Sequence, residues 1–274
     1  MLDRIVSAAP VFLLVAVRCF GMIMTLPLTN SRSISRIAKI AICGYAAFFL
    51  FPQVSLTEGS YAAYAEFISP QGSFNLQYIL CLLGEGLIGV ILGFYINMIF
   101  AAFSTAGQFF SFQMGFSAAE AYDSLSQVEN TLMGQYLNFV GLLVFLSNNW
   151  FQKLFLKGLE DSFKSINALS IVEHNDDLVK FMLSGLTHLF MNALLIALPV
   201  MATLFLINGA MGILSKASPQ MNMLSEGFPV LIMTTFFILT WLMPQLVNLF
   251  TSSFDDALKE IQNLYLKLGG QIQK

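Results

Sequence analysis

The chain has 274 residues, of which 57% are hydrophobic and 11% are charged, and its net charge is −3 at pH 7. Soluble globular domains carry roughly 25% charged residues, so the composition excludes an ordinary water-soluble protein. The weak charge and the lack of a basic stripe argue against nucleic acid as a partner. No Lys or Arg stands between Lys39 and Lys153, so lipid or protein must cover that stretch.

Six apolar runs predict helices, because about 20 apolar residues are needed to cross a hydrocarbon core roughly 30 Å thick. The first, Ile5–Leu28, follows Arg4 but is too long for a signal peptide, so we expect a retained membrane helix. The second, Ile40–Pro52, is short and is expected to be tilted, re-entrant or less than a full span. The other runs are Leu76–Phe103, Thr131–Ser147, Phe181–Leu214 and Gly227–Phe250.

Two further segments are expected to lie at the membrane surface or on a partner. Trp150–Lys157 combines aromatic residues with lysines, as is typical of the headgroup region. Ser252–Leu268 has apolar residues three and four positions apart, which predicts a separate amphipathic helix at the C-terminus.

The positive-inside rule gives no consistent topology for six crossings. Arg32, Arg36 and Lys39 favour a cytoplasmic loop after the first helix. Six later lysines then fall on the outer side, namely Lys153, Lys157, Lys164, Lys259, Lys267 and Lys274. Either the number of crossings differs from six, or simple insertion does not set the final position of these helices.

Arg18 and Glu85 are isolated charges inside apolar runs. A charge at a helix centre costs about 2.5 to 3.5 kcal/mol on insertion scales, so each needs a compensating partner. The favoured interpretation is that the two satisfy each other or backbone carbonyls and fix helix packing for assembly. Exchanging the two charges is then expected to restore part of the assembly. The alternative is a proton or ion pathway, which would need more such groups in register.

Glycines in the third apolar run predict close helix packing. Gly86 precedes Gly89 and Gly93, which form a GxxxG motif. Small residues at this spacing let helix backbones approach each other in lipid, where no hydrophobic effect separates a helix from its solvent. We therefore assign these three glycines to helix–helix contact.

Two segments between the apolar runs are punctuated by Gly, Ser or Pro. The first spans about residues 106–123, where Gly115 relieves the helical conformation and Met and Phe side chains can repack softly. An ordinary buried turn is the alternative for this segment. Its central residues are Phe110, Phe112, Gln113, Met114, Gly115, Phe116 and Ser117. The second segment is the polar, proline-rich tip of a helical hairpin. Its residues are Pro219, Gln220, Asn222, Gly227, Phe228 and Pro229.

The sequence carries no catalytic or metal-binding pattern. Cys19, Cys43 and Cys81 stand alone in apolar runs, which is typical of core cysteines. His174 and His188 lie outside any HExxH motif, and no P-loop, GxSxG motif or dinucleotide fingerprint is present. We expect a protein that is not an enzyme and has neither a cofactor nor a metal.

Short motifs in a fixed order along nearly the whole chain resemble one protein family. They are Arg18, Pro27, Glu85-Gly86, Gly89, Ala106-Gly107, Gln113-Met114-Gly115, Asp123, Ser162-Phe163, Ala197-Leu198-Pro199-Val200, Ser218-Pro219-Gln220-Met221-Asn222 and Gly227-Phe228-Pro229. This pattern resembles the FliR family, the export-gate subunit of flagellar type III secretion, whose injectisome relatives are called SctT or SpaR. Family members often have Asp-Pro where this chain has Asp123-Ser124, and Gly-His near Asn149-Trp150.

The resemblance implies an all-α, polytopic subunit that joins FliP and FliQ in a closed helical cone at the bacterial inner membrane, at the flagellar basal body. FlhB would wrap the base of this cone, and FlhA is a further expected partner. Residues 1–198 would be FliP-like, 199–251 a FliQ-like hairpin, and 252–274 the amphipathic helix. The segment 106–123 would be the plug that blocks the channel until an unfolded flagellar subunit arrives. The family's complex lies largely above the membrane plane, which would account for the topology problem.

Two alternative functions stay open. An injectisome subunit shares these motifs, and sequence does not firmly separate it from a flagellar one. A small-solute transporter would need internal repeats with broken helices that meet at a polar site. Pro199 is expected to break one long helix, but the first half of the chain has no matching break.

Overall fold

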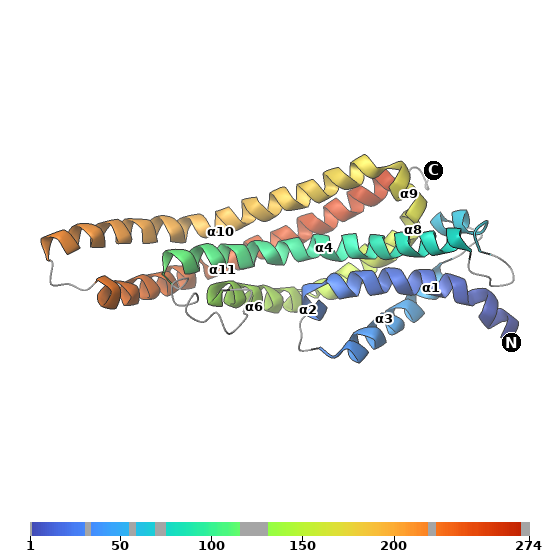
Figure 1. Ribbon diagram of the computed structural model, residues 1–274, viewed down its shortest axis with the longest axis horizontal. Coiled ribbons are helices and arrows are strands. Elements are labelled where there is room, and N and C mark those ends of the chain that lie inside the picture. The colour runs from blue at the N-terminus through green and yellow to red at the C-terminus, as the bar shows by residue number, and fades with distance from the viewer. Residues whose placement is uncertain are drawn as a thin grey trace. The chain divides into compact units, whose positions relative to one another are not determined.

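The computed structural model describes residues 2–30, 34–54, 59–68, 75–115, 131–218 and 223–269. These ranges are helical and contain no β-strand, which confirms the predicted all-α class (Figure 1). The long helices are α1 (Leu2–Thr25), α4 (Leu76–Gln113), α6 (Leu132–Ser147), α10 (Asn175–Ala217) and α11 (Met223–Leu268). The short elements are α2 (Pro27–Asn30), α3 (Arg36–Leu50), η1 (Phe51–Gln53), η2 (Ser60–Tyr64), α7 (Trp150–Lys153), η3 (Leu154–Glu160), α8 (Asp161–Ser165) and α9 (Ala168–Glu173).

Each of the six predicted apolar helices is present, but α11 is longer than expected. Ser252–Leu268 is helical, as predicted, but it continues α11 without a break and does not start a separate helix. No Gly or Pro stands at the junction to end the helix, and its hydroxyl groups donate to carbonyl oxygens of the preceding turn. Thr251 Oγ1 donates to the carbonyl oxygen of Val247 at 2.9 Å, and Ser253 Oγ donates to that of Leu249 at 2.8 Å.

The predicted helix break at Pro199 is also wrong, because Pro199 lies inside the continuous helix α10. Pro229 and Pro244 likewise lie inside α11. A proline removes one backbone hydrogen bond, a loss that membrane helices tolerate. The described chain therefore lacks the discontinuous helix that the transporter alternative would require at Pro199.

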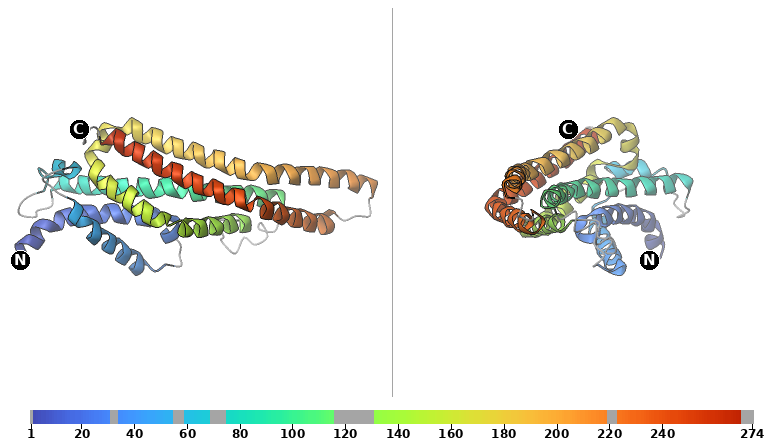
Figure 2. Two further views of the ribbon diagram at one scale, coloured as in Figure 1. Left: turned by 180° about the vertical axis from the view of Figure 1, so that it is seen from behind. Right: turned by 60° about the vertical axis from the view of Figure 1, so that its left-hand side comes forward.

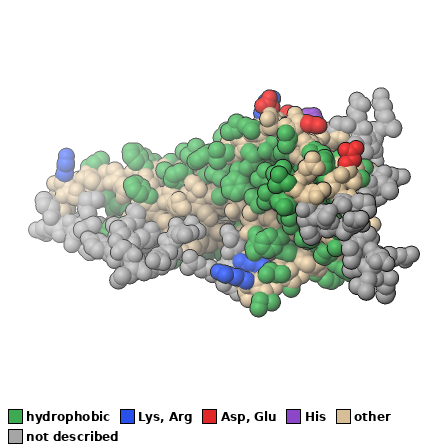
Figure 3. Space-filling model, turned by 45° about the vertical axis from the view of Figure 1, so that its right-hand side comes forward, with side chains coloured by type: hydrophobic (Ala, Val, Ile, Leu, Met, Phe, Trp, Pro, Cys, Tyr) green, Lys and Arg blue, Asp and Glu red, His purple; other side chains and the backbone are tan. Residues whose placement is uncertain are grey.

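Three helices are long and apolar enough to cross a membrane, so the chain is a multi-pass membrane protein. They are Leu76–Gln113, Asn175–Ala217 and Glu226–Leu268. A fourth span is possible if Leu132–Ser147 and Trp150–Ser165, bent by 70°, count as one. Six full crossings are therefore not found in the described residues. Hydrophobic side chains cover much of the face shown in Figure 3, and charged ones are sparse there.

The bend after α6 occurs at Asn149, which has a φ of 54°. This is the left-handed region, which glycine adopts readily and asparagine tolerates better than most residues.

Contacts divide the chain into two compact units, each built from separate segments. The first unit contains Met1–Asn97, Asn149–Gly185 and Phe254–Lys274. The second contains Met98–Asn148 and Leu186–Ser253. Within the first unit, α1 lies between α3 and the first part of α4 (Figures 1 and 2). The predicted division into FliP-like and FliQ-like parts concerns resemblance to other subunits and stays a prediction.

The core of the second unit is built on phenylalanine. The Phe250 ring of α11 packs against Phe100 and Phe103 of α4, with centroids 5.4 and 4.3 Å away. Phe145 of α6 meets Phe100 at 5.5 Å. Edge-to-face and tilted aromatic contacts of this kind hold three helices together.

Candidate functional site

Arg18 of α1 and Glu85 of α4 form an ion pair in the core of the first unit. Arg18 Nε donates to Glu85 Oε2 at 2.6 Å, and Nη2 donates to Oε1 at 2.9 Å. Both side chains are fully buried. This two-point geometry is the strongest arrangement for an arginine and a carboxylate. The two charges thus satisfy each other, in the pairing favoured from the sequence.

Two tyrosines of η2 complete the surroundings of Glu85. The hydroxyl of Tyr61 donates to Oε2 and that of Tyr64 donates to Oε1, each at 2.5 Å. Tyr64 Oη also accepts the backbone N–H of Ala168 at 2.5 Å. Burial is the main reason that the pKa of both tyrosines is raised, so both hydroxyls keep the protons that they donate.

The remaining donors of Arg18 reach α8 and the residue that follows it. Nη1 donates to Ser162 Oγ at 3.1 Å, and Nη2 also donates to the carbonyl oxygen of Ile166 at 2.9 Å. The Phe163 ring centroid lies 4.6 Å from Arg18 Cζ, within cation–π range. Arg18, Glu85 and Ser162-Phe163 belong to the motifs that resemble the FliR family, and the fold brings them together.

We call Arg18, Tyr61, Tyr64, Glu85 and Ser162 the buried polar network. It ties α1, η2 and α4 to the segment around Ser162. Each carboxylate oxygen of Glu85 accepts two hydrogen bonds, which fills its acceptor positions. The network therefore offers no open position for a substrate, and its geometry is that of a structural brace.

Beside this network, α1 and α4 approach closely through glycine. A Cβ atom on Gly89 would lie 2.1 Å from a carbonyl oxygen of α1, and one on Gly93 would lie 2.6 Å from another. One on Gly21 would lie 2.5 Å from the carbonyl oxygen of Gly86. Gly86 itself is less tight, with a Val17 methyl 3.0 Å from the Cβ position. The GxxxG motif thus lies in a helix–helix contact, and Gly21 is its unpredicted partner on α1.

The predicted plug segment starts inside α4, not in a loop. Phe110, Phe112 and Gln113 belong to the last turns of the helix, and Met114 and Gly115 follow in a turn. The reason is packing, because Phe110 and Met114 are fully buried, whereas Phe112 is 72% exposed and Gln113 is half-buried. The predicted plug residues Phe116 and Ser117 lie outside the described residues.

The plug segment and the hairpin motif meet inside the second unit. Gly115 has a φ of 80°, and a Cβ atom there would lie 2.2 Å from the ring of Phe228. Both the backbone conformation and this contact require glycine. Gly227, Phe228 and Pro229 lie in the first turns of α11, so they are not part of a loop. The tip residues Pro219, Gln220 and Asn222 lie outside the described residues.

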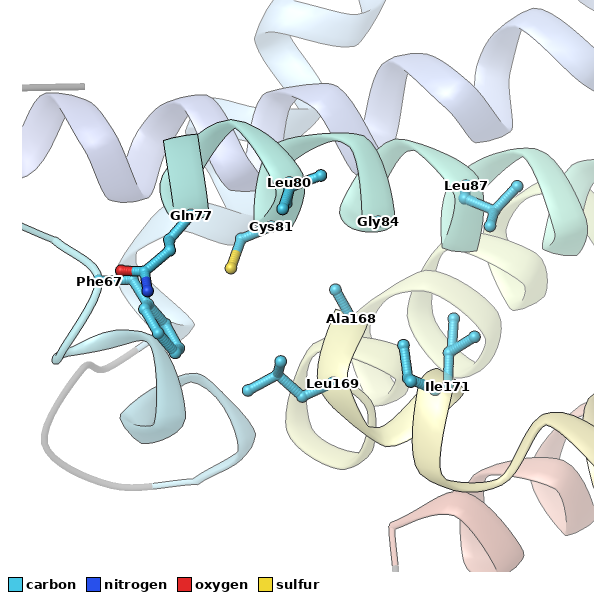
Figure 4. A pocket seen from close by; sticks show the side chains of 10 residues that line it. Phe67, Gln77, Leu80, Cys81, Gly84, Leu87, Ala168, Leu169 and Ile171 are labelled. Carbon is cyan, nitrogen blue, oxygen red and sulfur yellow. The ribbon is translucent and has the colours of Figure 1, made fainter. Parts of the chain in front are cut away.

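An apolar pocket of about 390 Å³ lies in the first unit (Figure 4). It opens between the start of α4, the segment after η2, and α9, and its walls are mostly aliphatic. The residues that line it are Phe67, Gln77, Leu80, Cys81, Gly84, Leu87, Ala168, Leu169, Ile171 and Val172. No acid or base accompanies the Cys81 thiol in this lining. Among the described residues, no three His, Cys, Asp or Glu side chains form a group that could hold a metal.

Several residues of the buried polar network were not predicted from the sequence. Tyr61 and Tyr64 lie in a short segment without periodicity. Their spacing of three is the one available signal, because it places both hydroxyls on one side of a 3₁₀ turn. Ser162 appeared in a family motif, but its contact with Arg18 spans 144 positions of sequence and has no local signal.

The chain is similar to several known bacterial proteins. The family of bacterial export proteins, family 1, matches residues 9–257. The flagellar biosynthetic protein FliR of Bacillus subtilis is 28% identical over 270 residues, which cover 98% of this chain and 99% of that protein. FliR of Borreliella burgdorferi is 38% identical over 154 residues, 56% of this chain and 57% of the relative. The surface presentation of antigens protein SpaR of Shigella sonnei is 27% identical over 155 residues, 57% of this chain and 59% of the relative.

The family match covers α1 through most of α11 and includes every residue of the buried polar network and the α1–α4 glycine contact. The order of the motifs, the helical fold and the matched range agree, and the chain belongs to the bacterial export proteins, family 1.

Proposed function

We propose that the chain is a core subunit of the flagellar type III protein export gate. With FliP and FliQ it would form the gated channel through which unfolded flagellar subunits cross the inner membrane. The observation that supports this most is the similarity to a FliR protein over 98% of the chain. FlhB and FlhA are the further partners that the proposal includes.

The end of α4 supports a role in gating. Phe110 and Met114 anchor the segment in the core, while Phe112 stays exposed. The turn at Gly115 rests against Phe228 in the second unit. A soft apolar segment at this place would yield to a passing polypeptide and would seal against water and ions at rest.

Deletion of residues 112–117 tests this proposal. We expect the shortened protein to co-purify with FliP and FliQ but to let small ions leak, measured as loss of membrane potential in cells that express the complex. Phe112→Leu is the matched control, because it keeps a large apolar side chain and should keep the seal. An unchanged membrane potential in the deletion variant would reject the plug assignment, and failure of the wild-type protein to co-purify with FliP and FliQ would reject the gate itself.

An injectisome subunit is the second candidate, supported by the similarity to SpaR. That match covers 57% of the chain, whereas the match to FliR of Bacillus subtilis covers 98%. The flagellar role is therefore favoured. Expression in a bacterium that lacks FliR distinguishes the two, since recovery of swimming on soft agar supports the flagellar role and secretion without swimming supports the injectisome.

A further inference from the structure

The helix α3 has an apolar outer face that the described chain leaves uncovered. Its inner face, which includes Cys43, Ala47 and Leu50, is buried, and α1 is its main neighbour. At its C-terminal end, Phe51 meets Phe12 of α1 edge to face, with ring centroids 5.8 Å apart. The large side chains of the outer face are exposed by 59 to 81%, and they are Ile37, Ile40, Tyr45, Phe48 and Phe49.

The N-terminal end of α3 carries a basic excess. Arg36 and Lys39 stand in its first turn, and no Asp or Glu occurs between Asp3 and Glu58. Among the described residues, neither basic side chain forms an ion pair. Cations at a helix N-terminus oppose the helix dipole, so these two do not stabilise α3 by themselves. They would be stabilised by anions from outside the chain.

Polarity changes along the axis of α3. After Lys39, the run to Phe51 contains no charged residue. At 1.5 Å per residue, the distance from Lys39 to Leu50 is about 16 Å, which is roughly half the 30 Å hydrocarbon core. The helix is thus too short to cross a bilayer but matches the depth of one leaflet.

We propose that the outer face of α3 is embedded in a single leaflet of an anionic bilayer. Arg36 and Lys39 bind phosphates of anionic phospholipids at the surface, and Phe48 and Phe49 lie among acyl chains. Basic and hydrophobic side chains adjoin along the lower edge of the face in Figure 3, the edge at which α3 lies in Figure 1. Charge complementarity favours anionic lipid as the occupant of this face, because an apolar protein partner would leave the two cations without a counterion.

Depth-resolved quenching tests the placement. Ile37→Cys and Phe48→Cys are made in the full-length chain after Cys19, Cys43 and Cys81 are replaced by Ala, and each is labelled with a bimane fluorophore. In vesicles of phosphatidylcholine and phosphatidylglycerol, iodide in water should quench the label at Ile37, and brominated acyl chains should quench the one at Phe48. Equal quenching at both sites would overturn the proposal. Protection of both labels from both quenchers would overturn it too, since it would mean a protein cover.

Headgroup selectivity is tested with the label at Tyr45→Cys. Brominated phosphatidylglycerol should quench it more than brominated phosphatidylcholine at equal content. Arg36→Gln with Lys39→Gln should lower this preference by about fivefold per charge, or roughly 30-fold in all. The charge-matched control, Lys164→Gln with Lys259→Gln, should leave it unchanged. An unchanged preference in the α3 variant would remove the anionic headgroup from the proposal.

Substitution of Gly44 tests, without any label, whether lipid or a closely packed helix covers the outer face of α3. It lies on the outer face, and nothing stands within 4 Å of its Cβ position. Lipid accommodates a new side chain, so Gly44→Leu should keep the thermal stability and assembly of the wild type. Loss of assembly in this variant would show that another protein packs on the face, contrary to the proposal.

Discussion

Replacing Glu85 by Gln should strongly destabilise the fold while preserving its shape. Glutamine keeps one acceptor oxygen, but its amide nitrogen would face the Arg18 guanidinium, which can only donate. The guanidinium would then be a buried charge without a countercharge. Breaking a buried pair in this way costs about 3 to 5 kcal/mol. Because part of the hydrogen bonding survives, we expect the lower end of this range.

Reversible unfolding in detergent, followed by far-UV circular dichroism during titration with sodium dodecyl sulfate, measures this cost. The control is Glu160→Gln, which removes a carboxylate from an exposed ion pair with Lys164, 2.8 Å long. Exposed pairs of this kind contribute about 0 to 1 kcal/mol. If Glu85→Gln lowers the free energy of unfolding no more than Glu160→Gln does, the network is not the brace that its geometry indicates.

The structure also changes the expectation for exchanging the two charges. A carboxylate at position 18 would face the carbonyl oxygen of Ile166, which now accepts a hydrogen bond from the guanidinium. An arginine at position 85 would leave the Tyr61 and Tyr64 hydroxyls without their present acceptor. We therefore expect Arg18→Glu with Glu85→Arg to restore neither stability nor assembly. Recovery in this variant would mean that charge balance alone matters.

Three further outcomes follow from the packing. Phe110→Ala should lower the free energy of unfolding by about 3 to 5 kcal/mol because it empties a core position. Phe112→Ala should change the free energy of unfolding by less than about 0.5 kcal/mol, and denaturant titration compares the two variants. Gly89→Leu should abolish the α1–α4 contact and reduce the amount of folded protein in membranes, whereas Gly209→Leu, with nothing within 4 Å of its Cβ position, should not. Gly115→Ala should cost about 1 to 2 kcal/mol from the left-handed backbone alone and more from the adjacent ring, and equal thermal stability would contradict that geometry.

Local sequence predicts the structure correctly where the signal lies within a single helix. The apolar run from Leu76 predicts α4, and the spacing of Gly89 and Gly93 predicts a close neighbour, because both signals depend on helical periodicity. The pairing of Arg18 with Glu85 was also within reach, since two opposite charges in apolar runs have few other partners. Gly21 could not be assigned, because one glycine in an apolar helix does not indicate which helix it meets.

Local sequence patterns do not predict element boundaries or nonlocal contacts. The plug segment was expected to leave the helix early, but burial of Phe110 extends α4 to Gln113. The amphipathic pattern that begins near Ser252 predicts a new helix, but a change of pattern without a helix breaker does not end the helix before it. Contact between Gly115 and Phe228 joins two motifs that were each identified, but their meeting depends on the packing of the whole second unit.

The membrane-spanning helices differ in how far the chain covers them. In the most apolar stretch of α4, 44% of residues are buried, against 28% in α10 and in α11. In α11, Met233, Phe237 and Trp241 form a stripe at intervals of four residues, each about three-quarters exposed. The apolar excess of the composition is therefore concentrated on the outer surfaces of α10 and α11.

The length of α10 indicates whether lipid alone can cover that surface or whether protein must cover part of it. Between Lys180 and Lys216 it carries no Asp, Glu, Lys or Arg over 35 residues, which at 1.5 Å per residue is about 52 Å. Even a tilt of about 40° leaves roughly 40 Å along the membrane normal, more than a hydrocarbon core of about 30 Å can cover. The surplus apolar surface needs a cover other than acyl chains, and neighbouring subunits of an export gate would supply it. The short helix α3 differs from α10 in both respects, because its first turn carries two cations and its apolar run is no longer than the depth of one leaflet.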